Sequence, residues 1–244
     1  MLGAPSFVPI EPENRAAYVR ARLDGSVWGR WAPAHTVYAA CLRLGAQLAA
    51  AGISANALTY ASLGLALGAG VAAAVQAFAL AALLVVSSGI CDVLDGAVAR
   101  ASGAQSRYGA LLDSTIDRYS DALPLVGLIV SFRAAGFALV VPALALLGAF
   151  SVSYVRARAE SLGAKLPNLF MRRTERLLLL TVCLLLGTLP FGFRFALMLG
   201  VLGTSAVLQA AATIAALRAA RVALAKLPGA PPVLPPPDAG ASSP

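Results

Sequence analysis

The segment Asp92-Val-Leu-Asp95-Gly96-Ala-Val-Ala-Arg100 is followed, after eight residues, by Gly109, Asp113 and Asp117. The positions from 92 to 121 hold five of the 11 acidic residues of the chain and are flanked on both sides by apolar sequence. A carboxylate in an apolar medium is strongly unfavourable unless it is paired with a cation or binds a metal. The segment therefore predicts a functional site inside a membrane protein.

The composition of the whole chain agrees with this prediction. The chain is 59% hydrophobic and 12% charged, with a mean hydropathy of +0.79, whereas soluble domains are about 45–50% apolar and about 25% charged. The net charge of +8 could indicate nucleic acid. However, the Lys and Arg residues are scattered at the ends of apolar runs, which is typical of residues that set membrane topology. We therefore expect the lipid bilayer, and not nucleic acid, as a partner.

Composition also divides the chain into four parts. They are a polar N-terminal lead-in (1–25), an amphipathic interfacial helix (26–52), a six-helix transmembrane catalytic domain (53–226) and a disordered Pro-rich tail (227–244). The six spans are expected at about 56–80, 81–100, 108–131, 137–162, 173–189 and 195–225. Ser54 or Asn56 is placed to cap the first span, whose Gly64, Gly68 and Gly70 would permit close helix approach. The predicted fold class is an all-α integral membrane protein.

The distribution of basic residues predicts the orientation in the membrane. Six spans put both ends of the domain on one side, together with most Lys and Arg residues, and only Arg133 and Arg194 fall on the other side. By the positive-inside rule the basic side is cytoplasmic. We expect a multi-pass protein of the cell membrane whose acidic site faces the cytoplasm.

The spacing of the aspartates predicts a metal site. Asp92 and Asp95 are three residues apart, and Asp113 and Asp117 are four apart, so each pair shares one helix face. A short turn between the two helices would bring these faces together as a cage of four carboxylates. Oxygen ligands favour Mg²⁺, Mn²⁺ or Ca²⁺. Two divalent ions would balance four carboxylates, an arrangement typical of phosphoryl transfer.

A purely structural alternative is a buried salt-bridge network between the aspartates and Arg100 and Arg107. We disfavour it because four carboxylates outnumber these two arginines. Gly96 and Gly109 leave room for a bulky ligand beside the carboxylates, and the two arginines suit a diphosphate. The pattern therefore favours a site that binds metal and phosphate.

The pattern Asp-x-x-Asp-Gly-x-x-Ala-Arg, eight residues, Gly-x-x-x-Asp-x-x-x-Asp resembles the signature of the CDP-alcohol phosphotransferase family at every fixed position. The resemblance implies a six-helix protein, usually a homodimer, that transfers the phosphatidyl group of a CDP-linked donor to an alcohol and releases CMP. It also implies two Mg²⁺ or Mn²⁺ ions. The metal ligands would be Asp92, Asp95, Asp113 and Asp117, with Asp117 also the catalytic base, and CDP-diacylglycerol would be bound by Asn56, Thr59, Gly96, Arg100, Ser106 and Gly109.

The acceptor alcohol is indicated by the segments 153–160 and 170–177. They resemble those of phosphatidylinositol-phosphate and archaetidylinositol-phosphate synthases, whose acceptor is inositol 1-phosphate. By this resemblance Arg156, Arg173 and Arg176 would bind the acceptor phosphate. The sequence departs from that group at Arg172 and Thr174, where a Glu and a Pro are usual, and it has Ala55 where a Pro is common.

Three alternatives remain open. The same chemistry with another acceptor, such as glycerol 3-phosphate, would still use the carboxylate cage. An ion-coupled transporter would use the aspartates as an ion site, and a silent membrane scaffold would keep only the fold. Metal-dependent release of CMP separates the enzyme from the last two.

Overall fold

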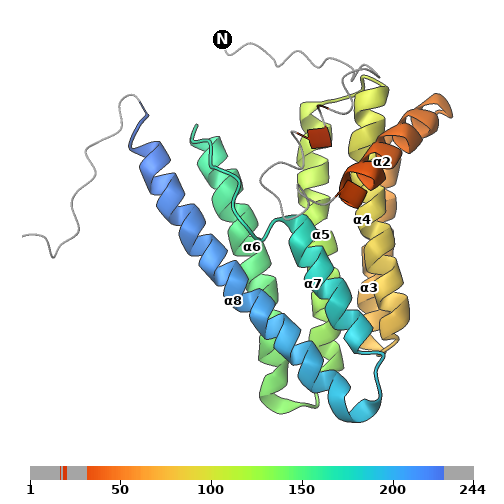
Figure 1. Cartoon of the computed structure of the whole chain (residues 1–244), viewed down its shortest axis with the longest axis vertical. Helices are drawn as coiled ribbons and strands as arrows, with labels where there is room; N and C mark the ends of the chain where they lie inside the picture. The colour runs from red at the N-terminus through yellow and green to blue at the C-terminus, as the bar shows by residue number, and fades with distance from the viewer. Residues whose placement is uncertain (1–16, 18, 21–31, 228–244) are drawn as a thin grey trace, which may run out of the picture.

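The computed structural model describes residue 17, residues 19–20 and residues 32–227, and every regular element in this part of the chain is helical. Figure 1 shows the helices arranged as one bundle. The elements are α2 (Ala32–Ala50), α3 (Ala55–Ala74), α4 (Phe78–Ala101), α5 (Arg107–Ser131), the 3-10 helix η2 (Gly136–Leu139), α6 (Val140–Ser161), α7 (Arg173–Leu186) and α8 (Phe191–Leu224).

Successive helices run up and down the bundle. α3 packs against α4 and α5, α6 packs against α8, and α7 packs against both α4 and α8 (Figure 1). α7 begins part of the way along the bundle, because the chain that leaves α6 turns back inward before the helix starts (Figure 1). The first turn of α7 is thereby placed beside the middle of α4 and α5.

A tight turn joins α3 to α4. Gln76 has a φ of 62°, and the N–H groups of Gln76 and Ala77 donate to the carbonyls of Ala73 and Ala72 at 3.1 and 2.8 Å. These two bonds form a Schellman motif with a non-glycine residue in the left-handed position. They end α3 at Ala74, so α4 begins at Phe78, three residues before the expected start of the second span.

α3 and α5 touch at their backbones. A Cβ atom at Gly127 would lie 2.1 Å from the carbonyl oxygen of Gly70, and one at Gly70 would lie 2.6 Å from the carbonyl oxygen of Leu123. Only glycine permits this approach. Gly70 thus confirms the expected close packing, whereas a Cβ atom at Gly64 would have no neighbouring atom within 4 Å.

The apolar core occupies the end of the bundle where α3 meets α4 and α7 meets α8. Its fully buried side chains include Leu128, Phe132, Leu184 and Met198. The rings of Phe132 and Phe195 pack edge to face with centroids 5.5 Å apart. This core fixes one end of the bundle, and the aspartates lie toward the other.

Four helical segments are long and apolar enough to cross a membrane: Ala55–Ala74, Phe78–Ala101, Gly136–Ser161 and Gly192–Leu224. α5 is not among them because it carries charged residues along its first half. α7 has 14 residues, a rise of about 21 Å against a hydrocarbon thickness of about 30 Å. The structure therefore supports four of the six expected spans by length and composition.

The remaining boundaries differ from expectation at a few positions. Ser54, and not Asn56, caps α3, since its Oγ accepts from Ala57 N at 3.2 Å. α8 begins at Phe191, directly after Pro190 and four residues before the expected start. α2 lies within the range expected for an interfacial helix (26–52), and it packs against α4 with Gly45 over Ala97. Its expected first residues (26–31), most of the lead-in and residues 228–244 of the tail lie outside the described residues.

Candidate active site

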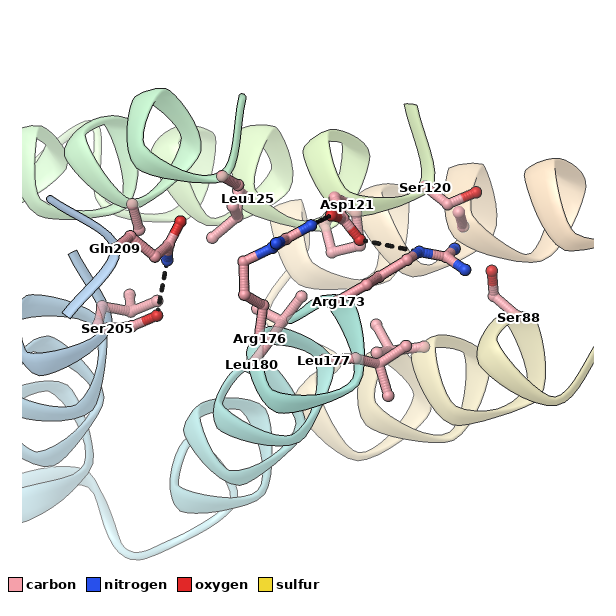
Figure 2. Close-up of a pocket in the computed structure, with 16 residues that line it drawn as sticks. Ser88, Ser120, Asp121, Leu125, Arg173, Arg176, Leu177, Leu180, Ser205 and Gln209 are labelled. Carbon is pink, nitrogen blue, oxygen red and sulfur yellow. Dashed lines mark hydrogen bonds and ion pairs between the residues drawn. The ribbon is translucent and has the colours of Figure 1, made fainter. Parts of the chain in front are cut away.

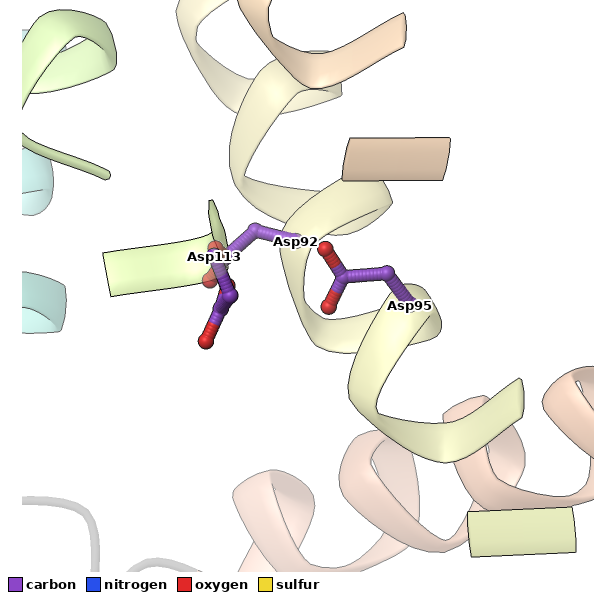
Figure 3. A group of neighbouring side chains, drawn as sticks. All are labelled: Asp92, Asp95 and Asp113. Atoms are coloured by element: carbon purple, nitrogen blue, oxygen red, sulfur yellow. The ribbon is translucent and has the colours of Figure 1, made fainter. Parts of the chain in front are cut away.

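The candidate site lies where the second half of α4, the first half of α5 and the first turn of α7 meet. Asp92, Asp95 and Asp113 each offer one carboxylate oxygen, and these oxygens all lie within 4.8 Å of one another. Figure 3 shows that Asp92 and Asp113 adjoin across the two helices and that the Asp95 carboxylate turns toward them. The predicted convergence of the two helix faces is confirmed for these three residues.

Thr59 holds Asp95 in place. The Thr59 hydroxyl donates to Asp95 Oδ2 at 2.6 Å, and both side chains are buried, with 4% and 5% exposed. Thr59 lies in the second turn of α3, which the glycine contact described above holds against α5. The Thr59 hydroxyl thus orients the Asp95 carboxylate within the cluster, as residues that hydrogen-bond to metal ligands commonly do.

Asp117 is linked to this trio by an arginine. Nη1 of Arg173 contacts an oxygen of Asp92 and lies 2.9 Å from Asp117 Oδ1, so one guanidinium nitrogen bridges the two carboxylates. Arg173 is the first residue of α7. The expected fourth carboxylate is therefore adjacent to the cluster, but it is paired with an arginine from a distant part of the sequence.

Asp121, one turn beyond Asp117 on α5, pairs with both arginines of α7. Its Oδ1 accepts from Arg173 Nε at 3.4 Å, and its Oδ2 lies 2.5 Å from Arg176 Nη2 (Figure 2). Arg176 also donates to Met171 O at 3.0 Å and to Ser153 Oγ at 3.3 Å. A salt-bridge network does exist, and it includes Arg173 and Arg176 of α7, which the structural alternative did not name.

The residues expected to bind the nucleotide gather at the same end of the bundle. Ser106 caps α5 by accepting from Gly109 N at 2.9 Å. A Cβ atom at Gly109 would lie 3.0 Å from Ser106 Oγ and 3.9 Å from Asn56 Oδ1. On α4, a Cβ atom at Gly96 would lie 3.1 Å from Arg100 Nη1, so the arginine lies across the glycine.

Of the three expected acceptor arginines, the structure brings two together. Arg173 and Arg176 line one cavity of about 30 Å³ between α4, α5, α7 and α8. Arg156 does not line it. Its guanidinium donates to Pro167 O at 3.2 Å in the loop before α7, in an exposed position.

Two features of the site were not predicted. One is the role of Asp121, which the sequence places next to the aspartate pattern but which acts as the counter-ion of two arginines more than 50 positions away. The other is the pair Ser205 and Gln209 on α8, which lines the same cavity. A buried amide in the last apolar span is a recognisable signal in the sequence, although nothing there shows what it faces.

The chain belongs to the CDP-alcohol phosphatidyltransferase family, because the family model matches residues 52–224. An uncharacterised protein of Aquifex aeolicus is 44% identical over 127 residues, which are 51% of this chain and 64% of the relative. The archaetidylinositol phosphate synthase of Methanothermobacter thermautotrophicus is 44% identical over 109 residues, which are 44% of this chain and 54% of the relative. The matched stretches thus span between half and two thirds of these relatives' lengths.

The fold resembles that of a solved member of this family. The crystal structure of Mycobacterium tuberculosis phosphatidylinositol phosphate synthase with CDP-DAG bound gives a TM-score of 0.67 at 23% identity, covering 80% of this chain and 98% of that chain. The structure of the same enzyme in complex with manganese and citrate gives a TM-score of 0.68. The bundle is therefore a known fold of this family.

Proposed function

We propose that this protein transfers the phosphatidyl group of CDP-diacylglycerol to inositol 1-phosphate and releases CMP. The observation that carries the proposal is the juxtaposition of the carboxylates of Asp92, Asp95 and Asp113 with the guanidinium groups of Arg173 and Arg176. Carboxylates suit metal ions, and the two arginines suit a phosphate on the acceptor. The named relatives, an archaetidylinositol phosphate synthase and a phosphatidylinositol phosphate synthase, support the same reading.

The donor set fits Mg²⁺ or Mn²⁺. The oxygens of Asp92, Asp95 and Asp113 lie close enough together to share an ion, and Asp117 stands beside Asp92 as a ligand for a second one. The manganese complex of the mycobacterial enzyme supports this choice of metal. When bound, two such ions would polarise the phosphate oxygens and offset the negative charge of the diphosphate.

Asp117 is the proposed base. It would accept the proton of the attacking hydroxyl of inositol 1-phosphate while that oxygen bonds to the β-phosphorus of the donor. The bond between the β-phosphorus and the bridging oxygen breaks, and CMP leaves with the electron pair. In this role the Asp117 carboxylate must be free of Arg173.

Arg173 links the metal site to the acceptor site. It contacts Asp92 and Asp117, which are also proposed metal ligands, so an ion and the guanidinium compete for the same oxygens. A phosphate on the acceptor offers Arg173 another partner, and Arg176 lies one turn further along α7. We infer that these two arginines bind the acceptor phosphate while Asp121 holds them in place.

The nucleotide would bind at the ends of α3, α4 and α5. Asn56, Ser106 and Gly109 cluster there, and Arg100 lies over Gly96, where its charge would face a phosphate of the donor. Because a helix N-terminus carries a partial positive charge, the start of α5 adds to this preference for an anion.

For the membrane we propose all six crossings, with the charged faces of α5 and α7 turned toward the interior of the bundle. Charged residues in the bilayer are expected to face a bundle interior, and those of α5 and α7 pair with each other there. Many large apolar side chains are exposed on the other helices, such as Leu67, Leu83, Leu147 and Val207. We propose that the site opens to the cytoplasm, that α2 lies along the membrane surface and that the protein is a homodimer.

The test is release of CMP by protein purified in detergent and given CDP-diacylglycerol and Mg²⁺. Inositol 1-phosphate, free inositol, glycerol 3-phosphate and L-serine are supplied in parallel reactions. We expect turnover only with inositol 1-phosphate. Turnover with glycerol 3-phosphate alone would keep the chemistry and replace the acceptor, whereas no metal-dependent CMP release with any alcohol would overturn the proposal.

A further inference from the structure

The cavity beside Arg176 has a charged end and a neutral polar end. Asp121, Arg173 and Arg176 line one end, and Ser205 and Gln209 of α8 line the other. Figure 2 shows the Gln209 and Ser205 side chains facing Arg176 across this space. Ser88 of α4, Ser120 of α5 and apolar side chains form the remaining walls.

Gln209 is held rigidly but is only partly satisfied. Its side chain is 2% exposed, and its Nε2 donates to Ser205 Oγ at 2.8 Å. Its Oε1 has no hydrogen-bond partner. A buried polar atom without a partner is unfavourable, and native structures keep few of them.

Two other atoms that line the same cavity share this property. Ser120 Oγ and Arg176 Nε are both buried without a hydrogen-bond partner. One acceptor oxygen, one hydroxyl and one charged donor thus border a single space. This combination indicates a polar ligand that brings both donors and acceptors.

The helix packing keeps the amide at this position. A Cβ atom at Gly148 of α6 would lie 2.8 Å from Gln209 Cβ and 3.1 Å from its Oε1. The glycine therefore lets α6 and α8 close around the amide. A larger side chain at position 148 would push Gln209 out of its contact with Ser205.

We infer that Gln209, oriented by Ser205, binds a hydroxyl of the polyol part of the acceptor, while Arg173 and Arg176 bind its phosphate. This inference rests on the proposed function and deepens it by naming the group that recognises the polyol. A neutral amide suits a hydroxyl, because it can accept and donate without the cost of burying another charge. The phosphate would lie at the charged end and a hydroxyl at the neutral polar end. At about 30 Å³ the cavity has room for about two water molecules, so the ligand would bind only with a shift of the side chains that line it.

Calorimetric titration of the detergent-purified protein in Mg²⁺ tests the inference without relying on turnover. The ligands are inositol 1-phosphate, which would contact both ends, and inorganic phosphate, which would contact only the arginines. We expect the wild type to bind inositol 1-phosphate at least tenfold more tightly than phosphate. We call this ratio of the two affinities the margin. Gln209→Leu should remove most of this margin and leave the affinity for phosphate within about twofold.

Two further variants provide controls. Thr204→Val removes an exposed hydroxyl from α8, one that donates to Gly200 O at 2.8 Å, and should leave both affinities unchanged. Gln209→Asn keeps the amide but shortens it, so it should reduce the margin even if the leucine variant fails to fold.

The outcomes separate this inference from the proposed function. An unchanged margin in both Gln209 variants, an equal loss of both affinities, or a wild type that binds both ligands alike would overturn the inference. A wild-type protein that shows the margin but releases no CMP would overturn the proposed reaction and keep the polyol site.

Discussion

The carboxylate cluster of α4 and α5 and the arginine-lined cavity of α7 and α8 are built in different ways. In the cluster, Asp92, Asp95 and Asp113 lie within about 20 positions of one another, and helical spacing turns their side chains to one point. In the cavity, Asp121 meets Arg176 across 55 positions, and Gln209 comes from the last helix. The first site depends on two helices and one turn, whereas the second depends on the whole bundle.

This difference suggests a division of tasks. On the proposed function, the cluster would supply the groups for the chemical step. The cavity would supply groups that select one acceptor among several. Substitutions in the cluster should therefore lower the rate at every acceptor concentration. Substitutions in the cavity should raise the acceptor concentration that gives half the maximal rate.

Asp117→Asn should give the largest effect. Loss of a general base typically lowers the rate by about 10²–10⁴-fold, and we expect that fall in the kcat of CMP release at saturating acceptor, with an unchanged melting temperature. Asp121→Asn, one turn along the same helix, is the matched comparison. It should mainly raise the KM for inositol 1-phosphate, and equal losses of kcat in both variants would contradict the division of tasks.

Arg176→Met should give a smaller and more selective effect. Arg176 is buried and contacts Asp121, Met171 and Ser153, so loss of its charge should reduce kcat/KM for the acceptor by about 100-fold, or about 2.7 kcal/mol. The KM for CDP-diacylglycerol should not change. Steady-state kinetics with each substrate varied in turn measures both values.

Arg156→Met is the control for that substitution. Because Arg156 is exposed and does not line the cavity, we expect less than a threefold change. A large loss of acceptor affinity in this variant would show that the phosphate site extends beyond the two arginines of α7.

Gly127→Ala should act on stability more than on either site. The new Cβ atom would overlap the carbonyl oxygen of Gly70, and overpacking of this kind costs about 1–3 kcal/mol. Unfolding in mixed detergents should show the loss. Gly64→Ala on α3 faces open space and should be neutral, so equal destabilisation by the two alanines would argue against a tight α3–α5 contact.

The sequence predicts the cluster well for a physical reason. Spacings of three and four residues define a helix face, and the turn around Ser106 is short enough that α4 and α5 must be neighbours. The spacing does not predict that Asp117 pairs with Arg173. The expected first residue of the fifth span, Arg173, is the first residue of α7, but nothing local specifies how deep in the bundle that residue lies. The inward loop before Arg173 is a property of the packed bundle, and it also explains why α7 is shorter than a complete span.

The same reasoning applies to the three arginines that were expected to bind the acceptor phosphate. Their common feature in the sequence is a position near the end of an apolar run. In the structure Arg173 and Arg176 turn inward on one face of α7, while Arg156 turns to the loop at Pro167. Helix phase can be estimated from sequence, but the depth at which a helix starts cannot.

The most direct test of the central claim is the stoichiometry of the reaction. CMP and the lipid product are quantified together, by chromatography and mass spectrometry, after incubation of the purified protein with CDP-diacylglycerol, inositol 1-phosphate and Mg²⁺. We predict one phosphatidylinositol phosphate for each CMP, and neither product when the metal is chelated. CMP that appears without a new lipid, or lipid that forms without metal, would contradict the account.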